Sequence, residues 1–160
     1  MPKRSAGLLL HRTTADGVVE VLVVHPGGPF WAKKDEGAWS VPKGEHDDGE
    51  DAHAAAHREF AEELGSPAPD GPEVPLGELR QPSGKRVTCW AVAADFDPTG
   101  FTSNDFEVEW PPRSGRIQAF PEVDRAEWCT VAEARTKLLK GQVPFLDALL
   151  AHLGPGHREG

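Results

Sequence analysis

The 160-residue chain contains no tyrosine, only two cysteines and one methionine. Cys89 and Cys129 are far apart and form no Cys-x-x-Cys pair, so the sequence indicates neither a disulfide framework nor a zinc knuckle. Cys89 lies in an apolar run, where we expect a buried free thiol. Without tyrosine, aromatic contacts with any ligand are left mainly to tryptophan and phenylalanine.

Long apolar runs and an excess of positive charge are also missing. No stretch approaches the roughly 20 apolar residues of a membrane helix, and residues 6–10 are too short for the apolar region of a signal peptide. We therefore expect a cytoplasmic protein without a membrane partner. The net charge of −9 argues against a broad nucleic-acid surface. It still permits a small anionic ligand, because a metal ion and a few basic side chains can reverse the local field.

The length predicts a single domain, which we place at residues 1–153. Residues 154–160 are expected to be a disordered tail. Near the amino terminus, two β-rich runs at residues 5–11 and 18–25 predict an antiparallel pair. A loop at residues 26–37 and a short strand at 38–42 should follow.

Residues 86–96 are apolar on both alternating faces, which predicts a strand covered on both sides. Shorter strands are expected at residues 117–120 and 127–129. Thr130 and Glu133 form a capping-box pattern that should start a helix near Val131, and residues 145–153 predict a second, amphipathic helix.

The helix predicted at residues 51–64 carries the chemically informative residues. It lacks proline and glycine, with Asp51 as the expected N-cap and Gly65 as the residue that ends it. Glu59, Glu62 and Glu63 share one face, because they are spaced i, i+3 and i+4. Such carboxylates repel each other. They form either a solvated acidic face or a site for a hard cation such as Mg²⁺.

The wider pattern favours the cation site. Gly44 is followed after five residues by Glu50, and after seven more by Arg58-Glu59-Phe60-Ala61-Glu62-Glu63-Leu64-Gly65. This pattern resembles the Nudix box, the signature of the Nudix hydrolase family. Ser66 departs from it, because the family usually has an aliphatic residue there. A weaker resemblance extends over residues 5–150.

The resemblance implies a fold, a cofactor and a role for each matching residue. The fold is an α/β/α sandwich with a mixed β-sheet, and the cofactor is Mg²⁺, with Mn²⁺ as an alternative. Glu59, Glu62 and Glu63 would be the metal-binding and catalytic carboxylates, joined by the backbone carbonyl of Gly44. Glu50 and Arg58 would form a structural ion pair. The general base stays open between Glu59 and a residue of a distant loop.

Residues outside the box complete the predicted site. We expect Glu122 to be a further acidic metal ligand, with Glu107 and Glu109 as competitors and a solvent-exposed loop acid as the alternative for all three. Lys43 should point its ammonium group towards phosphates. Trp31 and Trp110 lie in irregular stretches and are predicted to stack on a nucleobase, although tryptophans of small domains are more often in the core.

His53 and His57 are spaced i, i+4 on the opposite side of the helix from the glutamates. The spacing would suit a transition metal, but the sequence offers no obvious third ligand. We therefore expect a partly buried packing role.

Two functions agree with these patterns. The first is an Mg²⁺-dependent hydrolase that cleaves a phosphoanhydride bond in a substrate linked to a nucleoside diphosphate. The run Trp39-Ser40-Val41-Pro42-Lys43-Gly44 resembles members that act on nucleoside triphosphates or dinucleoside polyphosphates. The second is a non-catalytic Nudix-like module that binds a nucleotide. Since every acidic position of the box is filled, the enzyme is favoured.

Overall fold

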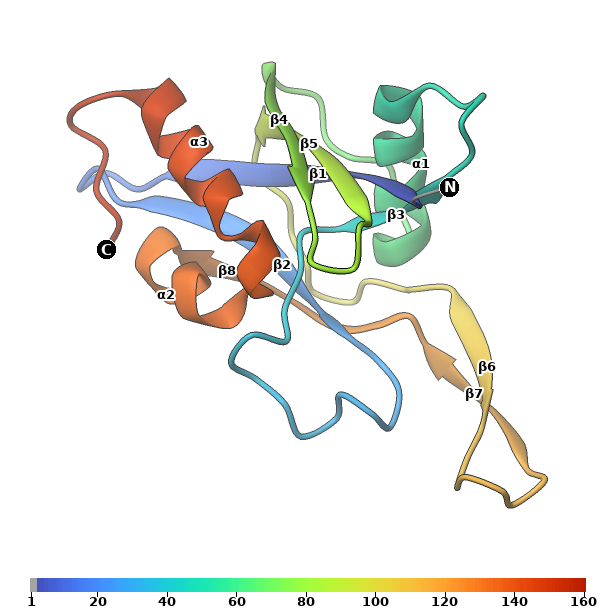
Figure 1. Ribbon diagram of the computed structural model, residues 1–160. Coiled ribbons are helices and arrows are strands. Elements are labelled where there is room, and N and C mark those ends of the chain that lie inside the picture. Colours follow the sequence, from blue (N-terminus) through green and yellow to red (C-terminus); the bar gives the residue numbers. More distant parts are fainter. Residues whose placement is uncertain (1–2) are drawn as a thin grey trace.

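The computed structural model describes residues 3–160 and shows a mixed β-sheet with helices on both faces (Figure 1). Across the sheet, the strands run in the order β4 (Glu73–Arg80), β5 (Arg86–Ala93), β1 (Arg4–Thr13), β2 (Val19–Pro26) and β8 (Val123–Thr130). A further strand, β3 (Lys43–His46), pairs with β1. The helices are α1 (Ala52–Leu64), α2 (Val131–Lys137) and α3 (Pro144–Leu153), with a 3₁₀ turn at Lys140–Gln142 before α3.

A separate hairpin projects from this body and is made by β6 (Asp105–Glu109) and β7 (Ile117–Pro121) (Figure 1). The chain returns from it directly into β8, so the hairpin stands beside the end of the sheet that carries the loop after β2. No helix within residues 3–160 has the length and apolar character needed to cross a bilayer.

Strand β1 organises the sheet because its two edges are used differently. One edge runs parallel to β5 along most of its length. The other edge is shared: β3 pairs antiparallel with the first half, with Gly7 opposite Lys43, and β2 pairs with the second half. A side chain on Gly7 would lie 2.5 Å from the carbonyl oxygen of Pro42, so glycine allows the close approach. The sheet therefore delivers Lys43 and Gly44 to the chain that enters α1.

Alternation along the strands produces two cores, one on each face of the sheet. On β1, Leu8 and Leu10 pack towards α1, whereas Leu9 packs towards α2 and α3. Strand β5 is covered on both faces, as its sequence predicts. Val87, Cys89 and Ala91 pack into the core beside α2 and α3, and the alternate residues of the strand pack into the core beside α1. Both cysteines are free and buried. The α/β/α sandwich with a mixed sheet is confirmed.

Helix α1 begins and ends where the sequence predicts. The side chain of Asp51 accepts a hydrogen bond of 2.9 Å from the backbone N–H of Ala54. Gly65 ends the helix with φ of 73°, a left-handed conformation that glycine adopts without steric penalty. Ala55, Ala56, Phe60 and Leu64 are buried against the sheet, which turns the glutamates away from that core. The capping box of Thr130 and Glu133 is present at the start of α2.

Two expected segments differ from the sequence prediction. Residues 38–42 form only isolated bridges, from Ser40 to Val24 and from Trp39 to Leu138, and the strand lies one segment later at β3. The N–H of Val41 donates instead to the buried side chain of Gln142, 101 residues further along the chain. This hydrogen bond takes the place of the strand pairing that the local sequence pattern predicts.

The last residues, expected to be disordered, are packed against the sheet in the structure. The carbonyl of Arg158 accepts a hydrogen bond from the N–H of Val19 at 2.8 Å, and Glu159 pairs with Arg135 at 2.6 Å. The tail therefore pairs with the residue before β2 through one isolated bridge, between Val18 and Arg158.

Candidate active site

The tightest contact of the site lies between β3 and α1. Glu59 is only 8% exposed, and its carboxylate lies directly against the Cα of Gly44. A Cβ at position 44 would be 1.9 Å from Oε2 of Glu59, far inside contact distance. The glycine of the box is therefore required by the space that the glutamate occupies.

Arg58 neutralises the acidic face of α1. Its guanidinium donates to both oxygens of Glu50, at 2.9 and 3.0 Å, in the bidentate arrangement that arginine and carboxylates favour. The same guanidinium lies 2.9 Å from Oε1 of Glu59 and 3.3 Å from both oxygens of Glu62. The hydrogen bond to Glu50 is the largest cause that raises the pKa of Arg58, and in return it lowers the pKa of Glu50. The ion pair predicted between Glu50 and Arg58 is present, and it also reaches two of the box glutamates.

Glu63 faces the opposite edge of the acidic surface and contacts β3. Its Oε1 accepts a hydrogen bond of 3.1 Å from the backbone N–H of Lys43. Burial is the main cause that raises the pKa of Glu63 to about 8, and the charges of Glu59 and Glu122 act in the same direction. A carboxyl group in this position holds a proton at neutral pH unless a positive charge is brought next to it.

Glu122 joins the box residues from a distant part of the chain. It stands between β7 and β8, where its N–H donates to the carbonyl of Asn104 and its carbonyl accepts from the N–H of Gly27. Burial, followed by the charge of Glu62, raises the pKa of Glu122. The competing residues Glu107 and Glu109 lie exposed on β6 of the projecting hairpin.

A cavity of about 190 Å³ opens where these elements meet. Its charged lining is Lys43, Glu63 and Glu122, and Trp31 forms part of its wall. The remaining lining residues are Val24, Pro26, Ala38, Ser40, Val123 and Leu139. Burial is the main cause that lowers the pKa of Lys43, with Lys85 adding to the effect and Glu63 opposing it. The cavity thus combines a lysine and acidic groups at one end with a tryptophan and apolar side chains around them.

The two tryptophans proposed for base stacking have different positions. Trp31 lines the cavity, in the loop after β2. Trp110 follows β6 and packs edge-on against Phe30, with ring centroids 5.3 Å apart, and it does not line the cavity.

Sequence reasoning missed the group that holds the loop carrying Trp31. His25 is fully buried, with Nδ1 2.8 Å from Oδ1 of Asp124 and Nε2 2.6 Å from the carbonyl oxygen of Lys34. Its ring also packs against Trp39, at 5.1 Å between centroids. A histidine at the end of an apolar strand was the available signal, but its partner lies 99 residues away.

The donor set fits a hard divalent cation. Burial is the main cause that raises the pKa values of Glu59, Glu63 and Glu122. Neighbouring carboxylates add to the effect: the charge of Glu62 acts on Glu59 and Glu122, and the charges of Glu59 and Glu122 act on Glu63, so these groups share one small region. Like charges held together in partly buried surroundings are stabilised by a multivalent cation, and oxygen ligands of this kind suit Mg²⁺. With such an ion, the lysine and the cavity would receive an anionic group beside the acidic face.

Comparison with known proteins supplies a family. A family model described as the NUDIX domain matches residues 1–151. None of the curated proteins matches the chain.

Several solved structures share the fold. An Ap4A hydrolase of C. elegans, in a binary complex, is 24% identical with a TM-score of 0.61, and the match covers 93% of this chain and 97% of that one. The NUDIX domain of Shewanella oneidensis NrtR, in complex with ADP ribose, is 16% identical with a TM-score of 0.64 and coverages of 96% and 90%. The C-terminal domain of mouse MUTYH, in complex with human PCNA, is 20% identical with a TM-score of 0.61 and the same coverages. At these identities, the likeness establishes the fold.

Proposed function

The chain belongs to the Nudix family, and from this premise we propose that it is a divalent-metal-dependent hydrolase that cleaves a phosphoanhydride bond in a substrate linked to a nucleoside diphosphate. Family and fold indicate a pyrophosphohydrolase. The observation that carries the proposal is the convergence of Glu63 with Lys43 and Glu122 at one cavity, next to Glu59, whose charge also acts on Glu63.

Glu59, Glu62, Glu63 and Glu122 would hold the cation, which we take to be Mg²⁺ with Mn²⁺ as a substitute. When bound, the ion supplies positive charge that neutralises the diphosphate oxygens and makes water more acidic. Lys43 would attract the phosphates from the cavity wall. Arg58 keeps Glu59 and Glu62 in place through its hydrogen bonds, so that a glutamate not fully used as a ligand can accept the proton of the attacking water.

Nucleoside triphosphates or dinucleoside polyphosphates are the substrates that we favour. Support comes from the strand before the box and from the fold neighbour that is an Ap4A hydrolase. Trp31 would stack on a base at the cavity wall. The cytoplasmic location remains a prediction from the sequence.

A substrate panel tests this proposal. Nucleoside triphosphates, dinucleoside polyphosphates, nucleotide sugars and ADP-ribose are incubated with the enzyme and Mg²⁺, and the products are separated by chromatography. We expect one of the first two classes to be consumed fastest and EDTA to stop the reaction. If no compound is consumed but several raise the melting temperature, the chain is the non-catalytic binding module instead.

A separate prediction concerns Glu122. Replacing Glu122 with Gln should raise the Mg²⁺ concentration needed for half-maximal activity and lower kcat by about 10- to 100-fold, because one charged ligand is lost at nearly constant volume. Activity is measured across a Mg²⁺ titration, with Glu107→Gln on the hairpin as the matched control. An unchanged rate and Mg²⁺ requirement in Glu122→Gln would remove this residue from the metal site.

A further inference from the structure

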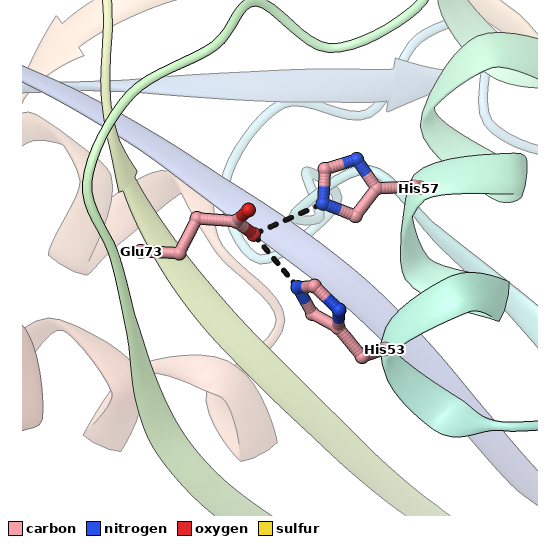
Figure 2. Close-up of side chains that lie close together, drawn as sticks. All are labelled: His53, His57 and Glu73. Carbon is pink, nitrogen blue, oxygen red and sulfur yellow. Dashed lines mark hydrogen bonds and ion pairs between the residues drawn. The ribbon is translucent and has the colours of Figure 1, made fainter.

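A second cluster of ligand-type side chains lies between the first half of α1 and the start of β4 (Figure 2). His53 and His57 project from the first half of the helix, and Glu73 begins the edge strand β4. Nε2 of His53 lies 2.9 Å from Oε1 of Glu73, and Nε2 of His57 lies 3.0 Å from the same oxygen. The figure shows both imidazoles turned towards this one carboxylate.

This arrangement adds the third ligand that the sequence did not offer. The two histidines were expected to have a packing role because no third ligand was apparent. The structure supplies one from a strand that the sequence did not predict, 16 residues from His57 and 20 from His53. The two imidazoles are partly buried, as the sequence predicts, and with 44% of His53 and 37% of His57 exposed they remain accessible to an ion.

The ligand atoms are already close to the spacing that a metal needs. One ligand atom from each residue lies within 4.8 Å of the others. Zinc binds nitrogen and oxygen ligands at about 2.0–2.2 Å, so tetrahedral neighbours stand roughly 3.3 Å apart. To admit the ion, the carboxylate oxygen would withdraw by a few tenths of an ångström from each imidazole, and the two imidazole nitrogens would draw together by at most about 1.5 Å.

The cluster is also held in position by its surroundings. The i, i+4 spacing places both imidazoles on one side of a regular helix, with ring centroids 4.9 Å apart. Trp90 of β5 packs against His53, with centroids 5.0 Å apart. Partial burial raises the pKa of Glu73, but the hydrogen bonds from the two histidines outweigh it, and the net pKa is below its ordinary value.

We propose that His53, His57 and Glu73 form a second cation site, which binds a transition metal of the Zn²⁺ class. Two imidazole nitrogens prefer such ions to Mg²⁺, which favours oxygen ligands and its own hydration water. Three protein ligands leave a fourth position for water. The bound ion would fasten the start of α1 to β4, and so stabilise the helix whose other end carries Glu59, Glu62 and Glu63.

The test uses untagged full-length protein, because a polyhistidine tag would bind the same metals. All proteins carry Glu63→Gln to weaken the box site, and Mg²⁺ is in large excess. Co²⁺ serves as the spectroscopic probe and Zn²⁺ as the calorimetric one. His57→Gln and Glu73→Gln are compared with His152→Gln, which changes an exposed histidine of α3.

We expect one Co²⁺ per chain with the visible bands of a four-coordinate site, displaced by Zn²⁺. His57→Gln and Glu73→Gln should each bind at least about tenfold more weakly, while His152→Gln should not change. Zn²⁺ at a hundred times its Kd should raise the melting temperature by roughly 5–10 °C. Binding that is equal in all variants, or absent beside Mg²⁺, would overturn the proposal. Melting curves without metal establish that the variants are folded, and because two ligands are changed separately, a folding failure of one leaves the other as the test.

Discussion

Glu63→Gln is expected to abolish turnover and leave the fold intact. The change removes a charge from the metal site at nearly constant volume, and the amide oxygen can still accept the hydrogen bond from the N–H of Lys43. We expect kcat to fall by about 10²- to 10⁴-fold at saturating Mg²⁺. Steady-state hydrolysis measures the effect, with Glu127→Gln, which changes an exposed side chain of β8, as a control that should keep full activity.

The raised pKa of Glu63 also makes the stability of the metal-free chain depend on pH, and the same variant tests this. The pKa of Glu63 is near 8 in the folded, metal-free chain and 4.5 ordinarily, so the group is protonated in both states below about pH 4.5. Between pH 4.5 and 8 the unfolded chain loses this proton while the folded chain keeps it, and stability falls as the pH rises. Without metal, Glu63→Gln should therefore be more stable than the parent by roughly 1–3 kcal/mol at pH 8.

Urea unfolding in EDTA at pH 5 and pH 8 checks this expectation. The stability difference between variant and parent should be small at pH 5 and larger at pH 8, since groups remote from Glu63 titrate alike in the two proteins. A variant that is less stable than the parent at pH 8, or unfolded, would mean that Glu63 is part of a structural ion network.

Gly44→Ala is expected to damage both the site and the fold. The new methyl group would overlap the carboxylate of Glu59, so this buried group, which Arg58 holds at 2.9 Å, would have to leave its position. Overpacking of this kind costs about 1–3 kcal/mol. Displacing a catalytic carboxylate by an ångström costs about 10²-fold in rate. Denaturant unfolding and kcat are the two measurements.

Gly49→Ala is the matched control for this prediction. Gly49 lies five residues after Gly44, in the loop between β3 and α1, and a Cβ added there meets no atom within 4 Å. Its activity and stability should be close to those of the parent. If Gly44→Ala behaved like Gly49→Ala, the close contact between Gly44 and Glu59 would have no functional importance.

Local patterns account for the parts of the molecule that the sequence predicts well. Helix α1 carries its own boundary signals in Asp51 and Gly65. Strand β5 has apolar residues on both of its alternating faces, which predicts that it is covered on both sides. Glu50 and Arg58, which form an ion pair, are eight residues apart, so one short sequence motif contains both of them. In each case, the residues that determine the feature are neighbours in the chain.

Features set by distant partners were not predictable in the same way. Strand β4 contains Pro75 and Gly77, which disrupt the alternating pattern, and pairing with β5 makes it a strand despite a register shift between them. Glu73 becomes a partner of His53 and His57 only through that pairing. The positions of Trp31 and Trp110 depend likewise on how the loop after β2 and the projecting hairpin fold.

Hydrolysis in ¹⁸O-labelled water tests the central claim most directly. The parent and Glu63→Gln are incubated with Mg²⁺ and the mixed nucleotide panel, and the products are analysed by mass spectrometry. We predict that the parent incorporates one ¹⁸O from water into a phosphate group of a nucleotide or phosphate product, and that Glu63→Gln and EDTA-treated parent do not. Label incorporation that is equal in parent and variant, or no product at all while the nucleotides bind, would contradict a hydrolase centred on the glutamates of α1.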